Sequence, residues 1–387
     1  MVFLTSWFFA FLLVAVLTYI FLPRAWRKYW LLAISMVFHG HFAGPAGVLP
    51  IVILGVTVYL AALAIEKWKI ATPMWTVGAV CILALIYYKY TGFLLELVGI
   101  SPEKTPVAPL AISFFTFEFV HYLIEVKKGG PALKNPIDFW LFAVFFPTIA
   151  SGPIKRYRDF QAQLDALPKK KITAPEIHEG LYRITSGLFK KLIIAEWAVD
   201  HIHRIEPWLH DSSLSSGYLW ALVGLQTTRI YMDFAGYSDV AIGIALLLGI
   251  RVPENFNWPY IAHNLSDFWT RWHISLSSWI RDYIYIPLGG GRVSAPRKVF
   301  NGFSAMVLCG IWHGPALHFA AWGIYHGLGL ALQEPISKIV RPLFPSEKIY
   351  RSWTRAWTFL FVALGWLIFF YEWSDLKWIL ARMIGLS

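Results

Sequence analysis

Apolar runs separated by short basic clusters constrain this chain more than any other feature. Several of the runs, such as residues 46–65 and 76–97, have the length of about 20 residues that a helix needs to cross a bilayer. Across 387 residues only 15% are charged and 57% are hydrophobic. Such a chain has too few polar groups to cover its apolar surface in water, so we predict an all-α polytopic membrane protein.

Basic residues indicate how the chain is oriented. The first run, residues 2–22, is followed by Arg24, Arg27 and Lys28, the reverse of the order in a secretory signal, so we expect an uncleaved helix with its N-terminus outside. Two further runs, residues 29–43 and 46–65, then return the chain to Lys67 and Lys69 on the inner side, where basic residues are favoured. The net charge of +11 therefore indicates loops at an anionic membrane surface, and we expect no nucleic-acid partner.

Familiar motifs for zinc binding, serine nucleophiles and nucleotide phosphates are missing from the sequence. HExxH, GxSxG and GxxxxGK[ST] do not occur. The two cysteines, Cys81 and Cys309, lie in apolar runs and are interpreted as small buried hydrophobic residues. His201 and His203 form an HxH pair without further ligands at a recognised spacing, so we interpret them as loop residues and expect no metal site.

Charged residues inside apolar runs need partners or a function. Lys89 is interpreted first as a snorkelling side chain. Glu118, His121 and Glu125 have helical spacing within residues 107–126, so they are expected on one face that points into the protein, either as a satisfied polar face or as a catalytic one.

A second group of charges lies in the run 217–250, which contains TRIYMDFAGYSD. Arg229, Asp233 and Asp239 are expected to have internal partners. Gly236 allows the backbone to leave a regular helix, so we predict a hairpin or two broken helices over this run.

Two other segments are predicted not to cross the membrane in the ordinary way. Residues 137–149 are too short to span, and Lys134 and Lys155 flank them, so we predict a re-entrant or buried element whose two flanks lie on the same side. Residues 176–199 mix charges with apolar residues at helical period, which indicates an interfacial amphipathic helix.

The stretch SDFWTRWHISLSSWIRDYIYIPLGGG, residues 266–291, concentrates charges and large aromatic residues. Arg271 and Arg281 can pair with Asp267 and Asp282, and we expect at least one such pair because buried charges are normally compensated. His273 lies in this stretch, and a second histidine, His313, follows 40 residues later. Histidine moves protons near neutral pH, and a dry site protects an activated acyl group from hydrolysis.

The last spans are expected over residues 299–312, 316–332 and 357–371, with a shorter tail at 376–386. His313, His318 and His326 cannot share one helical face, because offsets of five and eight residues correspond to roughly 140° and 80° of rotation. A tri-histidine metal site on one helix is therefore not expected.

Several of these motifs resemble the membrane-bound O-acyltransferase (MBOAT) family, and within it the bacterial alginate O-acetyltransferase branch. The matching residues are RWHISLSSWIRDYIYIPLGG, GIWHG, YMDFAGYSDVAIG and PENF, supported by SFFTFEFVHYLIEV, FFPTIASGPIKR and LGWLIFF. The sequence departs from the usual pattern at Thr270, Ala235 and Leu317-His318, while both histidines are retained.

The resemblance implies a single domain over residues 1–387, with about 10 to 11 transmembrane helices in a ring around a thin core with a tunnel. Within it, residues 1–126 would be N-terminal spanning helices, 127–333 a catalytic core with re-entrant elements, and 334–387 C-terminal helices. The expected location is a bacterial inner membrane.

The resemblance also implies site residues. His313 matches the catalytic histidine of the family and His273 the second histidine of the bacterial branch. Substrate contacts are expected from the other residues of the matching motifs: Trp312, Asp233, Tyr237, Asp239, Asn255, Trp272, Ser275 and Arg281. No permanently bound cofactor is expected. Acetyl-CoA or an acyl-carrier-protein thioester would be the donor, an SGNH-hydrolase-like protein the outer partner, and a cell-surface polysaccharide the final acceptor.

Other functions stay open at this point. The sequence ends sooner after LGWLIFF than alginate acetylases usually do, which leaves room for other polymers or for D-alanyl transfer from a carrier protein toward teichoic acid. A transporter subunit of a polysaccharide secretion system is a further alternative. It predicts inverted repeats, and the sequence shows no internal repeat.

Overall fold

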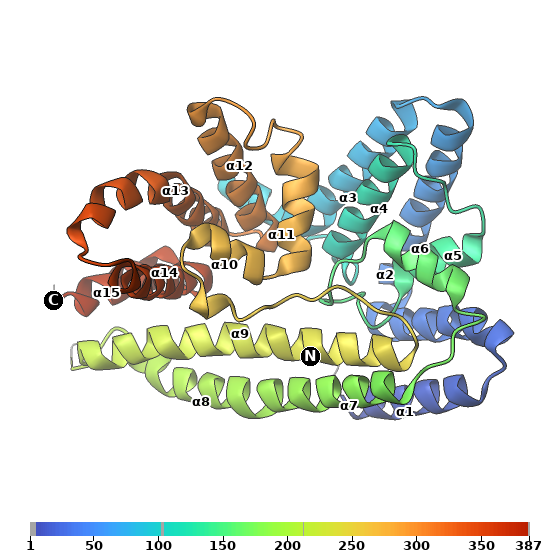
Figure 1. The fold of residues 1–387 in the computed structure, drawn as a ribbon, viewed down its shortest axis with the longest axis horizontal. Helices are drawn as coiled ribbons and strands as arrows, with labels where there is room; N and C mark the ends of the chain where they lie inside the picture. Colours follow the sequence, from blue (N-terminus) through green and yellow to red (C-terminus); the bar gives the residue numbers. More distant parts are fainter. Residues whose placement is uncertain (1–4, 102–103, 212, 386–387) are drawn as a thin grey trace. The chain divides into compact units, whose positions relative to one another are not determined.

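The computed structural model describes residues 5–101, 104–211 and 213–385, and within these it contains helices and no strand (Figure 1). By its internal contacts the chain divides into two compact units, residues 1–185 with 237–253 and residues 186–236 with 254–387. The first unit contains α1 (Ser6–Phe21), α2 (Arg27–Trp68), α3 (Thr72–Leu97), α4 (Ile112–Lys127), α5 (Pro136–Val144) and α6 (Tyr157–Ala166). The second contains α8 (Glu196–Ile205), α10 (Leu265–Arg271), α11 (Ile274–Ile280), α12 (Ala295–His313), α13 (Leu317–Val340), α14 (Glu347–Phe370) and α15 (Trp373–Met383). Two helices pass from one unit to the other, α7 (Ala174–Phe189) and α9 (Ser216–Leu247).

The membrane character of the chain is visible in its long helices. Within the described residues, four helices are long and apolar enough to cross a membrane: residues 24–68, 72–97, 216–247 and 347–370. In α3 only 11% of the apolar window is buried within the protein, so its apolar side chains require a nonaqueous neighbour. The prediction of an all-helical polytopic membrane protein is therefore confirmed.

A kink joins two of the predicted runs into the single helix α2. Gly44 has a φ of 64°, outside the helical region, and Pro45 follows it. Glycine adopts a positive φ without steric cost, and proline removes a backbone donor. The predicted runs 29–43 and 46–65 are therefore the two arms of this kinked helix.

The short apolar segment 137–149, predicted as a re-entrant or buried element, begins with the nine-residue helix α5 and is largely buried. Asn135 caps it by accepting a hydrogen bond from the amide of Ile137, and Asp138 forms an ion pair with Lys28 at 2.7 Å. Lys155, the basic flank on the other side of this segment, is not a surface residue. Its side chain is buried and its ammonium group lies 2.6 Å from Glu118 Oε1.

The predicted amphipathic helix is present and continues beyond its predicted end. Helix α7, a π-helical turn at Lys190–Ala195 and α8 follow one another without a break. The interpretation of His201 and His203 as loop residues was wrong, because both lie in α8 and His201 Nδ1 is 2.8 Å from the carbonyl oxygen of Trp197. The acidic and basic residues around them have enough helical propensity for the helix to continue.

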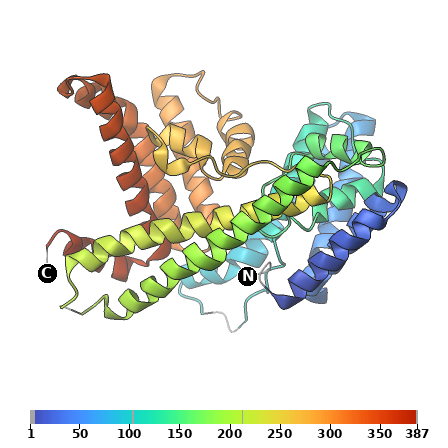
Figure 2. The same cartoon turned by 60° about the horizontal axis from the view of Figure 1, so that its bottom comes forward.

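The prediction of a hairpin or broken helices over residues 217–250 was also wrong. Helix α9 is one helix of 32 residues, and it runs alongside α7 and α8 (Figure 2). Gly236 and Gly243 allow α9 to pack closely against α7. A Cβ atom at Gly236 would lie 2.7 Å from the carbonyl oxygen of Gly187, and one at Gly243 would lie 2.5 Å from that of Gly180. Missing side chains let the helices approach closely, as in other tight helix pairs.

In the second unit, α12 and α13 form a close hairpin. A Cβ atom at Gly323 would lie 2.5 Å from the carbonyl oxygen of Met306, so the two backbones touch where α13 carries no side chain. A separate apolar core joins α8, α9, α14 and α15 through residues such as Ile202, Leu222 and Leu367. Both cysteines are free and buried, as predicted.

Candidate functional site

His273 sits at a short break between two helices. It caps the N-terminus of α11 with a φ of 44° and a ψ of 53°, in the left-handed region, and only 2% of its surface is exposed. A non-glycine residue in this region is uncommon and persists where surrounding structure fixes it. Its ring packs edge-on against Phe234 of α9, at 4.6 Å between centroids.

The segment before α10 holds His273 in place. Phe256 and Trp272 form an isolated antiparallel bridge, and the amide of Ile274 donates to the carbonyl oxygen of Asn255 at 2.9 Å. The fully buried side chain of Asn255 completes the contact, because its Oδ1 lies 3.3 Å from His273 Nδ1 and accepts a hydrogen bond from Ser275 Oγ at 2.6 Å. Three of the sequence-predicted site residues, His273, Asn255 and Ser275, are thereby brought together.

His313 is the last residue of α12. Extended backbone at Gly314 and the following Pro315 end the helix there. Three aromatic rings surround the imidazole, Trp322 at 5.3 Å and Phe369 at 5.1 Å, both edge-on, and Phe319 at 6.4 Å. The sequence-predicted Trp312 is adjacent, with its ring 5.0 Å from that of His313.

Aromatic contacts connect the surroundings of the two histidines. Trp272, next to His273, lies 4.8 Å from Trp366, and Trp366 lies 5.9 Å from Phe369, which contacts His313. Both histidines belong to the second unit, although they lie 40 positions apart in the sequence.

The charged residues predicted for the site have other partners. Asp233 forms an ion pair with Lys191 at 2.7 Å, one residue before the Phe234 that contacts His273. Arg281 is mostly exposed and pairs with its neighbour Asp282 at 2.8 Å, and the predicted pair of Arg271 with Asp267 is present at 2.7 Å.

The remaining predicted site residues belong to the first unit. Tyr237 is buried there, and Asp239 forms an ion pair with Arg183 at 2.6 Å. Arg229, in the second unit, donates to Gln226 Oε1 at 3.3 Å and lies 4.7 Å from the ring of Phe370. The expectation that charges within residues 217–250 have internal partners is thus confirmed.

Two residues near His313 were not predicted as site residues. The ring of Trp322 contacts both His313 at 5.3 Å and the fully buried His326 at 4.8 Å. Trp322 is among the largest fully buried side chains of the described residues. A tryptophan and a histidine four positions apart in an apolar run share a helical face, and that spacing was available in the sequence.

The described residues contain no group of three or more histidine, cysteine or acidic side chains suited to a metal ion. What the arrangement can supply is an imidazole in aromatic surroundings and a second imidazole fixed by an amide. A neutral imidazole accepts a proton and returns it near neutral pH, and it acts well where bulk water is excluded.

The fold defines a multi-pass α-helical membrane protein, and its second unit contains both His273 and His313. Comparison with known families is specific: the profile of the MBOAT, membrane-bound O-acyltransferase family matches residues 3–373. The chain belongs to this family.

Curated relatives of the chain include O-acetylases and acyltransferases. The chain is 36% identical to the "Probable alginate O-acetylase AlgI" of Pseudomonas aeruginosa over 81% of this chain and 59% of that protein. It is 32% identical to the peptidoglycan O-acetyltransferase of Helicobacter pylori over 98% of this chain and 79% of that protein. It is also 32% identical to the teichoic acid D-alanyltransferase of Bacillus subtilis over 74% and 75% of the two chains. The chain spans only about three fifths of the length of the alginate O-acetylase of P. aeruginosa.

Proposed function

We propose that the protein is a membrane O-acyltransferase that moves an acyl group, acetyl in the first instance, from a thioester donor to a hydroxyl group of a partner protein or cell-surface polysaccharide. The observation that carries the proposal is the grouping of His273 and His313 in one compact unit of a chain that matches the acyltransferase family over residues 3–373. Similarity to alginate and peptidoglycan O-acetyltransferases supports a polymer-directed acetyl transfer.

In the proposed reaction His313 is the general base. It takes the proton of the acceptor hydroxyl while the hydroxyl oxygen attacks the thioester carbonyl carbon. The carbon–sulfur bond then breaks, and the imidazolium returns the proton to the departing thiolate, which leaves as a free thiol. The rings of Trp322, Phe319 and Phe369 pack against the imidazole, and apolar surroundings of this kind limit hydrolysis of the acyl group.

We assign His273 the role of binding and orienting the acyl donor. Asn255 Oδ1 is an acceptor, so its contact with His273 Nδ1 places the proton of the neutral ring on Nδ1. The lone pair of Nε2 is then left to accept a hydrogen bond from the acyl donor and to orient it for attack. Asn255 and Ser275 are therefore positioning residues in this proposal.

The setting of the reaction follows from the family resemblance. We place the chain in a bacterial inner membrane with its N-terminus outside, coenzyme A or a carrier protein presenting the thioester from the cytoplasm, and an SGNH-hydrolase-like protein receiving the acyl group outside. The ring of helices around a tunnel stays a prediction. D-alanyl transfer from a carrier protein is the second candidate, supported by similarity to the D-alanyltransferase of B. subtilis.

A transfer assay tests the proposal directly. The purified protein in lipid nanodiscs, supplied with radiolabelled acetyl-CoA and its outer partner, should acetylate that partner. The His313→Ala variant should lose about 10² to 10⁴-fold in rate, the typical contribution of a general base. His318→Ala removes a nearby histidine outside the proposed machinery and should retain activity. Full activity in His313→Ala would overturn the assignment, and transfer from a D-alanyl carrier protein alone would select the second candidate.

A further inference from the structure

The first unit contains a pocket that the proposed reaction does not use. Its volume is about 330 Å³, far more than the roughly 30 Å³ that one water occupies. The end of α1, the start of α2, the segment before α7, α7 itself and the end of α9 contribute its lining. Five lining residues are apolar and three are basic: Val16, Ile20, Ile172, Ile177, Leu247, Arg24, Arg27 and Lys171.

Arg27 is the buried cation of this pocket. It is 9% exposed, and its Nε and Nη1 atoms have no hydrogen-bond partner among the described residues. Its guanidinium carbon lies 4.8 Å from the ring centroid of Tyr19, whose hydroxyl donates to the carbonyl oxygen of Leu248 at 2.6 Å. The ring of Tyr19 therefore packs against one face of the guanidinium group, and the Arg27 side chain also lines the pocket. A buried charge of this kind requires a compensating anion.

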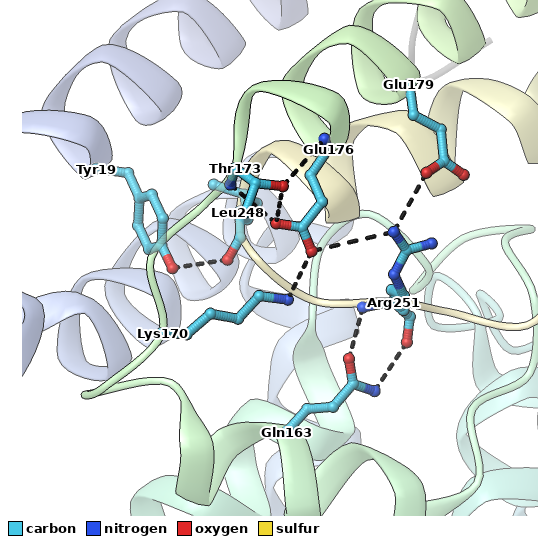
Figure 3. Close-up of polar contacts among 8 residues, drawn as sticks. All are labelled: Tyr19, Gln163, Lys170, Thr173, Glu176, Glu179, Leu248 and Arg251. Atoms are coloured by element: carbon cyan, nitrogen blue, oxygen red, sulfur yellow. Dashed lines mark hydrogen bonds and ion pairs between the residues drawn. The ribbon is translucent and has the colours of Figure 1, made fainter.

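Acidic side chains close in sequence to the lining residues are already engaged (Figure 3). Glu176 pairs with Lys170 at 3.1 Å and accepts hydrogen bonds from both the amide and the hydroxyl of Thr173. These contacts, first of all the one from the Thr173 amide, lower the pKa of Glu176, so it is ionised at neutral pH. Glu179 pairs with Arg251 at 3.2 Å.

The three pocket cations, Arg24, Arg27 and Lys171, have no carboxylate partner in the part of the chain that the structure describes. Three positive charges beside five apolar side chains form a surface that is complementary to an amphiphile with an anionic head.

We propose that this pocket binds the phosphate headgroup of an anionic phospholipid, with Arg27, Arg24 and Lys171 on the phosphate and an acyl chain along α1. Guanidinium groups bind phosphate oxygens through paired, charge-assisted hydrogen bonds. Leu17 and Phe21 of α1 are 47% and 84% exposed, and they continue the apolar surface beside Val16 and Ile20 of the lining.

A phospholipid fits this chemistry better than a soluble phosphate compound. A free phosphate or coenzyme A would leave the apolar part of the lining in contact with water, whereas an acyl chain covers it. Basic pockets between membrane helices are also where anionic headgroups concentrate. The binding site is independent of acyl transfer, so either proposal can fail alone.

Native mass spectrometry of the full chain tests the proposal. The protein released from nanodiscs of phosphatidylglycerol and phosphatidylcholine should retain phosphatidylglycerol. Arg24→Gln and Lys171→Gln, both at exposed positions that folding tolerates, should each weaken retention about fivefold, the contribution of one basic residue near an anionic surface. Arg27→Gln should weaken it by about tenfold or more, because its contacts are buried.

Lys169→Gln is the matched control. Lys169 is exposed, lies two residues before Lys171 and does not line the pocket, so the variant removes the same charge from the same segment. Its retention of phosphatidylglycerol should equal that of the unmodified protein. Equal retention in all four variants would overturn the proposal. Binding of coenzyme A or inorganic phosphate that displaces the lipid and is lost in Arg24→Gln and Lys171→Gln would replace the phospholipid with a soluble phosphate compound.

Discussion

One amide oxygen joins Asn255 to His273: Asn255 Oδ1 lies 3.3 Å from His273 Nδ1 and also accepts a hydrogen bond from Ser275 Oγ at 2.6 Å. Because Asn255 is fully buried and pairs through its backbone with Ile274 as well, it fixes both the backbone and the ring of the histidine. The left-handed conformation of His273 depends on such support.

Asn255→Ala should therefore reduce the rate constant for acyl transfer by about 10²-fold, the effect of a misplacement of roughly 1 Å. The reason is lost orientation of His273, so kcat should fall more than KM changes. Asn255→Asp retains an oxygen acceptor at the same place and should recover at least part of the lost kcat. Steady-state transfer kinetics with acetyl-CoA measure both variants.

Asn257→Ala is the control for this experiment. Asn257 lies two residues further along the same segment with its side chain exposed, and its backbone amide makes the contact with Arg271. The variant should keep the activity of the unmodified protein. Equal losses in Asn257→Ala and Asn255→Ala would show that the segment, and not the contact with His273, determines activity.

Arg281 provides a test of the predicted substrate contacts. Its side chain is 62% exposed, and its partner Asp282 is its neighbour in the chain. An exposed ion pair contributes only about 0 to 1 kcal/mol, so Arg281→Gln should leave the melting temperature almost unchanged. If Arg281 contacts the donor, KM for acetyl-CoA should rise with kcat unchanged, the signature of lost uniform binding.

Arg292→Gln is the appropriate comparison, since Arg292 is an exposed arginine in the turn that follows the same stretch. It should alter neither KM nor the melting temperature. An unchanged KM in Arg281→Gln would remove Arg281 from the set of substrate-binding residues.

The sequence predicted the helices well because apolar runs and their period are local properties. Helices α3, α5 and α14 each overlap one of the predicted apolar segments, residues 76–97, 137–149 and 357–371 respectively. The predicted grouping of His273 with His313 came from motif resemblance and stays a prediction, although both residues belong to the second unit.

What the sequence could not supply were partners fixed by tertiary packing. Nothing local in FFPTIASGPIKR distinguishes Lys155 from its neighbour Arg156, yet Lys155 is buried and its partner is Glu118 of α4. The bridge between Phe256 and Trp272 is equally nonlocal. The backbone freedom of glycine predicts a break in the helix at Gly236. In the structure the helix continues there, and Gly236 is needed because a Cβ atom would collide with neighbouring atoms.

The buried pair of Lys155 and Glu118 makes a prediction about stability. Lys155 Nζ lies 2.6 Å from Glu118 Oε1 and 2.9 Å from Thr148 Oγ1, and both charged side chains are almost fully buried. Lys155→Met leaves the carboxylate without its cation and should lower the free energy of unfolding by about 3 to 5 kcal/mol. The double variant Lys155→Met with Glu118→Gln should recover much of that loss. Denaturant unfolding in detergent measures both.

A surface pair of the same residue types is the control for this measurement. Lys134 lies 4.0 Å from Glu66, and its side chain is 78% exposed. Lys134→Met should cost less than about 1 kcal/mol. A similar loss in Lys134→Met and Lys155→Met would show that burial does not decide the strength of the pair.

Helix α9 offers a test of how its glycines act. In an open helix position alanine is more favourable than glycine by roughly 0.5 to 1 kcal/mol. No atom lies within 4 Å of the position of a Cβ at Gly224, so Gly224→Ala should raise the melting temperature slightly. At Gly236 the same Cβ would lie 2.7 Å from the carbonyl oxygen of Gly187 and 3.1 Å from the amide of Lys191. Gly236→Ala should therefore lower the melting temperature, and a rise in both variants would mean that α9 does not pack tightly against this segment.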